Sequence, residues 1–177
     1  RSVSRGLGDV YKRQALRCTA AVGGGIPWLT NLERVKRLDT VCAVGGIMNG
    51  TTNFIMDAMH KAPVDFPAIL KEAQDLGYAE ADPSADIDGD DIRRKLCISA
   101  NIAFDAALEE TAIPTFGIRT VTAADIAAFR AHGFACKLLA RAESTDSGVC
   151  AYVEPTLVGA GDLEAAVPAN FNLITYE

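Results

Sequence analysis

One short stretch, Gly77 to Lys95, gathers most of the side chains in this sequence that could do chemistry. Its six carboxylates are Glu80, Asp82, Asp86, Asp88, Asp90 and Asp91. Three cations, Arg93, Arg94 and Lys95, stand at its end. Like charges at this spacing repel one another unless cations, hydrogen bonds or a polar ligand offset them. We therefore expect a loop that is either well solvated or occupied by a ligand.

A calcium loop is one interpretation of these acids. When Gly89 is aligned with the invariant glycine of an EF-hand, three residues take ligand positions, namely Ser84, Asp86 and Asp88. Lys95 then stands where the loop requires a bidentate glutamate, and its charge would repel the ion. The pattern argues against an EF-hand, whereas a simpler magnesium site at Asp86 and Asp88 stays open.

The end of the stretch also has a purely structural interpretation. Acidic residues favour the first turn of a helix, and we expect a helix from near Asp90 to Phe104. Asp90 would form an i,i+4 ion pair with Arg94. Asp91 would do the same with Lys95, and each pair on a solvated face is worth only about 0.3–0.5 kcal/mol.

The functional interpretation gives these residues separate tasks. A lysine held by a carboxylate one helical turn earlier can donate or accept a proton in a cleft, if burial favours its neutral form. Lys95 and Asp91 have this spacing. Glu80 and Asp86 would then offer anionic contacts to a cationic group such as an ammonium. The combination suits a substrate that resembles an amino acid.

Two glycine-containing turns precede the acidic stretch. The first, Val22 to Pro27, leads into a helix predicted from Pro27 to Asp39 and a buried strand predicted from Thr40 to Val44. A dinucleotide fingerprint would need a glycine where Trp28 stands, so the loop indicates dinucleotide binding only weakly. We expect Trp28 to pack in the core.

The second turn, Asn49-Gly50-Thr51, opens the next predicted helix. Asn49 and Gly50 favour a turn, and we expect Thr51 or Thr52 to cap the helix. The free N–H groups of a helix N-terminus can also hold a carboxylate or a phosphate. Plain capping is the simpler interpretation of this turn.

The remaining pattern predicts two helices and a hairpin. The helices cover residues 66–76 and 121–132, the second with a capping box between Thr122 and Asp125. Strands over residues 134–141 and 149–158 would flank a turn at 143–148. A short apolar run near Leu173 follows.

Composition bounds the class of protein. The chain has 177 residues, 49% of them hydrophobic and 23% charged, which suits one globular domain. Its net charge of -6 argues against non-specific binding to nucleic acid or to an anionic membrane, and no apolar run is long enough to span a bilayer. The five cysteines are Cys18, Cys42, Cys97, Cys136 and Cys150. They form no Cys-x-x-Cys and are interpreted as small buried thiols of a cytoplasmic protein, without disulfides or zinc.

Residues 1–14 differ from the rest of the chain. They carry four cations against one carboxylate and show no helical or strand periodicity. We expect residues 1–14 to be a non-native or disordered tail, with a partner-binding basic arm as the alternative. Residues 15–177 would form the domain.

Four motifs occur in order along the chain: Val22–Pro27, Gly46–Ile55, Glu72–Pro83 and Asp86–Leu96. Together they closely resemble the catalytic domain of homoserine dehydrogenases, over roughly Ala15 to Glu177. The resemblance implies an oxidoreductase that interconverts L-homoserine and L-aspartate 4-semialdehyde with NAD or NADP. This reaction leads to threonine, methionine and isoleucine.

The resemblance also implies roles for individual residues. Lys95 would be the catalytic proton donor to the semialdehyde oxygen. The substrate-binding residues would be Glu80, Asp86, Asp91, Thr51 and Tyr78. Asn49 and Gly50 would lie beside the nicotinamide of the cofactor. A sodium ion would be held at Thr19, Val22, Gly24 and Ile26, although the family usually has a glutamate in place of Thr19.

The resemblance further implies an α+β fold. We expect a mixed, mostly antiparallel sheet with helices packed on one face, and an open face that meets a second copy in a homodimer. The nucleotide-binding Rossmann half would be absent from this chain, which we expect to be truncated at both ends and inactive alone. A non-catalytic module that binds a cation or mediates oligomerisation is the alternative function.

Overall fold

The computed structural model describes residues 20–177, so the predicted tail and Thr19 lie outside the described residues. The helices are α2 (Trp28–Val35), α3 (Gly50–Lys61), α4 (Phe66–Asp75), α5 (Ser84–Ile87), α6 (Asp90–Phe104) and α7 (Ala123–Ala131), with 3-10 turns η1 (Glu110–Ala112) and η2 (Leu163–Ala166). The strands are β1 (Ala43–Ile47), β2 (Phe134–Thr145), β3 (Gly148–Gly159) and β4 (Leu173–Tyr176).

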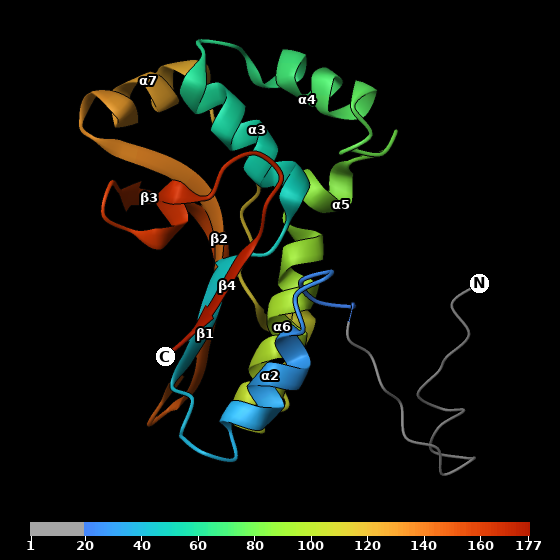
Figure 1. The fold of residues 1–177 in the computed structure, drawn as a ribbon, viewed down its shortest axis with the longest axis vertical. Helices are drawn as coiled ribbons and strands as arrows, with labels where there is room; N and C mark the ends of the chain where they lie inside the picture. Colours follow the sequence, from blue (N-terminus) through green and yellow to red (C-terminus); the bar gives the residue numbers. More distant parts are fainter. Residues whose placement is uncertain (1–19) are drawn as a thin grey trace.

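The four strands form one sheet in the order β3-β2-β1-β4. Figure 1 shows α6 and α2 on one side of this sheet, with α3, α4 and α7 gathered at its upper end. The α+β prediction is confirmed. The expected mixed sheet is wrong, because each described strand pair is antiparallel.

Helix α6 carries the main packing between the helices and the sheet. Ile92 and Leu96 are fully buried on α6, which contacts β1, β2 and β3. Val44 of β1 and Ala142 of β2 are paired across the sheet and buried as well. Such burial of apolar surface is the main stabilising contribution to a fold of this size.

The hairpin and the last helix follow the sequence prediction. Strands β2 and β3 pair from Phe134 and Gly159 to Thr145 and Gly148, so they are longer, and the turn shorter, than predicted. The capping box is confirmed: the Thr122 hydroxyl accepts from the backbone N–H of Asp125, whose carboxylate accepts from the Thr122 N–H.

Strand β1 begins three residues later than predicted and runs through two glycines. A Cβ atom on Gly45 would clash with the Ala140 carbonyl of β2, so the close strand spacing requires glycine there. The predicted strand stopped at Val44, and the sheet extends it through both glycines to Ile47. Helix α2 ends at Val35 and not at Asp39, and Leu38, which was expected on its apolar face, is 89% exposed.

Two further expectations concern buried side chains. Trp28 is 4% exposed and its indole N–H donates to the Ser99 hydroxyl at 2.9 Å, as expected for a packing residue. The cysteines were expected to be buried, but only Cys136 is buried among those that the structure describes. Within residues 20–177 no helix combines the length and apolar character needed to cross a membrane.

Candidate active site

The lysine and carboxylate that were predicted to form a pair on α6 do so. The Lys95 ammonium lies 2.7 Å from the Asp91 carboxylate, and the two side chains are 21% and 31% exposed. Lys95 also donates to the Met48 carbonyl at 3.0 Å, just after β1. An ammonium has three N–H donors, so two are held by these groups and the third has no partner among residues 20–177.

Asn49 connects this pair to a second carboxylate. Its amide nitrogen donates to Asp86 and to Asp91, both at 2.8 Å. Its carbonyl oxygen accepts the backbone N–H of Thr52 at 2.9 Å, so Asn49 is the N-cap of α3 and the predicted threonine cap is wrong. Because one amide offers two N–H donors, it holds both carboxylates close together.

The side chains expected on the substrate side of the turn are also adjacent. The Thr51 hydroxyl donates to the Tyr78 carbonyl at 2.6 Å, and the Tyr78 ring packs on Phe54 with 5.1 Å between centroids. At Gly50 a Cβ atom would lie 2.6 Å from the Asn170 carbonyl, so the turn needs glycine where the loop before β4 passes it.

Glu80 is the one predicted substrate ligand that the protein's own contacts do not hold in place. Its side chain is exposed and has no hydrogen bond or ion pair with any other residue of the described part of the chain. Its backbone carbonyl accepts from the Gln74 amide at 3.0 Å, which anchors the loop at this point. The carboxylate is therefore available to a ligand.

Arg119 offsets part of the repulsion in the acidic stretch. Its guanidinium contacts the Asp88 carboxylate at 2.5 and 2.9 Å and the Ser84 hydroxyl at 3.1 Å. Hydrogen bonding to Arg119 lowers the pKa of Asp88, and hydrogen bonds from Ser84 lower the pKa of Asp82. Sequence reasoning missed Arg119, because nothing local links it to a carboxylate 31 residues away.

One predicted ion pair is wrong. Asp90 pairs with Arg93 at 3.0 Å, one residue before the expected partner Arg94. Arg94 pairs instead with Glu110 of η1 at 3.2 Å. Arg93 also forms an ion pair with Glu110, so both arginines contact the same carboxylate of η1.

The glycine loop proposed for sodium is only partly described. Gly24 adopts a left-handed conformation, and the Ile26 carbonyl already accepts the N–H of Trp28 at 2.7 Å. Thr19 lies outside the described residues, so the sodium site at Thr19, Val22, Gly24 and Ile26 stays a prediction. Among residues 20–177 no three His, Cys, Asp or Glu side chains are grouped closely enough to hold a metal ion.

Comparison with known proteins gives a consistent result. The family model of homoserine dehydrogenase matches residues 27–177. Homoserine dehydrogenase of Corynebacterium glutamicum is 42% identical in an alignment of 163 residues that covers 89% of this chain and 37% of the relative. The Bacillus subtilis homoserine dehydrogenase is 39% identical over 155 residues, 88% of this chain and 36% of the relative.

Solved structures agree with the sequence matches. A homoserine dehydrogenase crystal structure from Thiobacillus denitrificans superposes with a TM-score of 0.91 and 36% identity, covering 97% of this chain and 40% of the other. A putative homoserine dehydrogenase from Archaeoglobus fulgidus gives a TM-score of 0.85 at 32% identity, covering 98% and 53%. The chain thus spans 37% of the length of the Corynebacterium glutamicum relative. On these matches and on the motifs that form the site, the chain belongs to the homoserine dehydrogenase family.

Proposed function

We propose that this chain supplies the substrate-binding and proton-transfer site of an NAD(P)-dependent homoserine dehydrogenase, which interconverts L-homoserine and L-aspartate 4-semialdehyde. One observation supports this above the others: the Lys95 ammonium is held by the Asp91 carboxylate and the Met48 carbonyl, with one N–H left over. The alternative of a non-catalytic module explains neither this arrangement nor the family membership.

The proton-transfer step follows from the position of Lys95. Reduction of the semialdehyde adds a hydride to its carbonyl carbon and a proton to its oxygen. A bound nicotinamide cofactor supplies or accepts the hydride. Lys95 donates the proton as negative charge develops on the oxygen, and its neutral amine takes the proton back during oxidation of homoserine. Asp91 stabilises the ammonium, while the Met48 carbonyl fixes its direction.

The acidic groups suit the ammonium of the substrate. Asp86 uses one carboxylate oxygen for Asn49, and its other oxygen has no partner within the described residues. We propose that this oxygen and the exposed Glu80 carboxylate bind the substrate ammonium, with Thr51 and Tyr78 lining the same side. The charge of these groups would also discriminate against substrates that lack a cationic group.

The turn at Asn49 and Gly50 is our proposed contact with the cofactor. Both ends of the Asn49 amide are already engaged, with two carboxylates and with the Thr52 N–H. The side chain therefore fits a nicotinamide poorly, and any contact from this turn comes through its backbone.

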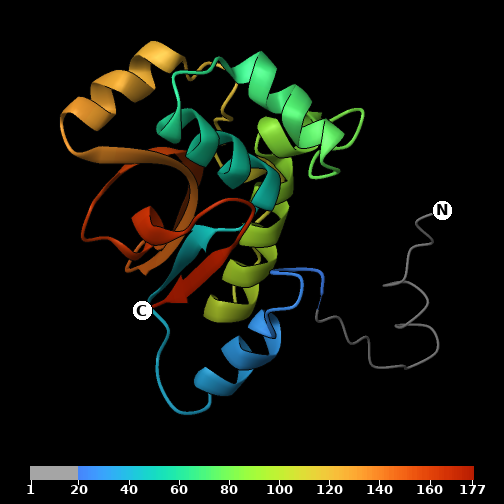
Figure 2. The ribbon, with the colours of Figure 1, turned by 45° about the horizontal axis from the view of Figure 1, so that its top comes forward.

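We also propose that the open face of the sheet meets a second copy. Pairing across the sheet places Leu139 with Glu154 and Arg141 with Tyr152 on the side away from α6. Leu139 and Tyr152 are half-buried there, and Figure 2 shows this side without a covering α-helix beside β1 and β4. Leu139 and Tyr152 thus lie between charged side chains of the same face, and apolar residues with polar neighbours are typical of an interface between subunits.

Replacement of Lys95 tests the proton-transfer role. Because the chain spans 37% of the Corynebacterium glutamicum enzyme, residues 27–177 are placed in that enzyme in exchange for the matching segment. We expect Lys95→Met to lower kcat by at least about 100-fold, the usual contribution of a general acid. The matched control is Lys71→Met, which removes an exposed lysine that also has an i,i+4 partner, Asp75.

The control variant should keep kcat within about twofold of the parent chimera, as surface substitutions usually do. The proton-transfer role of Lys95 would be refuted by a Lys95→Met variant that folds, binds homoserine and retains about a third or more of the parent kcat.

A further inference from the structure

A second polar site lies at the opposite end of α3 from Asn49. It is a cavity of about 390 Å³ between the C-terminal half of α3, the corner that joins α7 to β2, and the η2 turn. Its polar lining comes from Asp57, His60, Arg130 and Lys137. His60 follows Asn49 by eleven residues, about 16 Å along a helix, so the cavity is separate from the Lys95 site.

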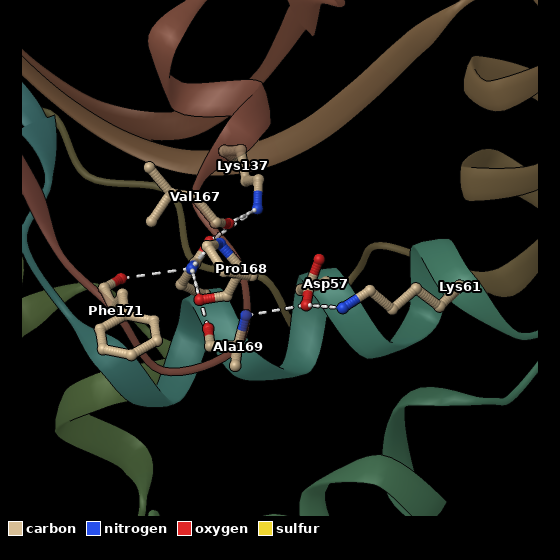
Figure 3. A network of polar contacts seen from close by, with 8 residues as sticks. Asp57, Lys61, Lys137, Val167, Pro168, Ala169 and Phe171 are labelled. Carbon is tan, nitrogen blue, oxygen red and sulfur yellow. Dashed lines mark hydrogen bonds and ion pairs between the residues drawn. The ribbon is translucent and has the colours of Figure 1, made fainter.

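Lys137 is the unusual residue of this cavity. Its side chain is only 2% exposed, although it lies on β2 and carries an ammonium. It donates to the Asn53 side-chain oxygen at 2.9 Å. It also donates to the Val167 carbonyl at 2.8 Å, a contact drawn in Figure 3. Neither acceptor is charged, and the third N–H has no partner among residues 20–177.

The nearest carboxylate is already engaged elsewhere. Asp57 accepts from the Lys61 ammonium at 2.7 Å and from the Ala169 N–H at 2.8 Å, and Figure 3 shows both contacts. No ion pair joins Asp57 to Lys137 within the described residues. The ammonium is thus buried without a bonded counter-ion, which is a costly arrangement unless an anion completes it.

Two further groups of the same cavity are short of partners. The His60 Nδ1 atom is buried and has no hydrogen-bond partner among residues 20–177. Arg130 stands exposed at the rim and donates to the His60 carbonyl at 3.2 Å. The lining therefore carries two cations, Arg130 and Lys137, against the single carboxylate of Asp57, which already pairs with Lys61.

The rest of the lining is apolar. Met56, Phe134 and Cys136 line the cavity together with small side chains of the η2 region, Ala160, Ala165 and Ala166. A volume of this size holds a small organic molecule, and apolar walls with a few convergent polar groups are typical of such sites.

We propose that this cavity binds a small monocarboxylate with a short apolar body. Its two oxygens accept the third N–H of Lys137 and an Nδ1–H of His60, while Arg130 at the rim attracts the anion from solvent. The body lies against Met56 and the η2 alanines. A phosphate dianion fits less well, because one buried ammonium beside Asp57 offsets only one negative charge.

Sodium butyrate is the probe that tests this site in the 177-residue chain. We expect saturable shifts in the NMR resonances of the Lys137 ε-methylene and the His60 ring, with a dissociation constant of roughly millimolar size for so small a ligand. Butylammonium chloride has the same body and the opposite charge, and sodium phosphate has the charge without the body. Both should leave these resonances unchanged apart from the effect of ionic strength.

Variants assign the binding to the cavity. Lys137→Met keeps the length of the side chain and should weaken butyrate binding at least about tenfold. His60→Gln, at a partly exposed position, gives a second measurement should Lys137→Met fail to fold, and it should weaken binding about threefold. Lys71→Met on α4 is the matched control and should change nothing.

Two results would overturn the proposal. One is the absence of saturable shifts up to about 50 mM butyrate, which would mean that water alone satisfies these donors. The other is equal binding by the His60→Gln variant or by butylammonium. Neither result depends on catalysis, so the proposed function and this second site can fail independently.

Discussion

Substituting Asn49 would show how much the bridge between Asp86 and Asp91 stabilises the domain. Asn49 does two things at once: it caps α3 through Thr52 and donates to the two carboxylates. Serine is an equally good N-cap but has no amide to bridge the carboxylates, whereas alanine can do neither. The pair of variants therefore separates capping from bridging.

The structure sets the expected magnitudes. A lost N-cap costs about 1 kcal/mol. Each hydrogen bond to a carboxylate contributes about 1.5 kcal/mol here, the low end of its range, because Asp91 is about one-third exposed and screened by water. We expect Asn49→Ser to lower the free energy of unfolding by about 3 kcal/mol and Asn49→Ala by about 4 kcal/mol.

Urea denaturation of the 177-residue chain at neutral pH measures both values. Asn31→Ser is the matched control, because Asn31 is an exposed position on α2, and it should stay within about 0.5 kcal/mol of the wild type. An Asn49→Ser variant as stable as the wild type would refute the bridging argument. Equal losses in the serine and alanine variants would refute the capping role.

Two further predictions concern acid stability and assembly. Burial raises the pKa of Asp57, but hydrogen bonds from Lys61 and Ala169 and the charge of Lys137 outweigh it and lower the pKa below its ordinary value of 3.8. The stabilisation from this carboxylate is therefore complete above pH 3.8 and is lost as the pH falls through the folded-state pKa. The difference in unfolding free energy between the wild type and Asp57→Asn should shrink over the same pH range. Urea titrations that give the same difference at every pH would contradict this. For assembly, the wild-type chain should sediment as a dimer at tens of micromolar concentration. The Leu139→Glu variant should sediment as a monomer with an unchanged circular dichroism spectrum. A wild-type chain that is monomeric at this concentration would count against the open-face interface.

Local patterns predicted much of the backbone correctly. The capping box of Thr122 and Asp125 identified α7, and two strand-like runs on either side of turn residues identified the β2–β3 hairpin. The residues at which a strand begins or ends depended instead on contacts with other strands. The strand predicted to end at Val44 continues to Ile47, and at Gly45 only glycine allows the Ala140 carbonyl of β2 to come so close.

In the candidate site, contacts within one helix were likewise predictable from the sequence, whereas contacts between separate elements were not. The pair of Asp91 and Lys95 was predictable, because residues four apart share one face of a helix. The direction of the lysine was not, since Met48 is 47 residues away and meets Lys95 only where β1 runs beside α6. The bridge from Asn49 likewise joins carboxylates 37 and 42 residues distant.

The sequence by itself determined the chemical groups of this protein, their spacing along each helix and the family motifs that contain them. Only the tertiary structure decided which groups meet. It directed the Asn49 amide to two carboxylates, gave Asp88 its partner Arg119, and buried Lys137 beneath the loop that follows η2. The physical reason is that helical and strand periodicity act over a few residues, whereas hydrogen bonds and burial depend on distance in space.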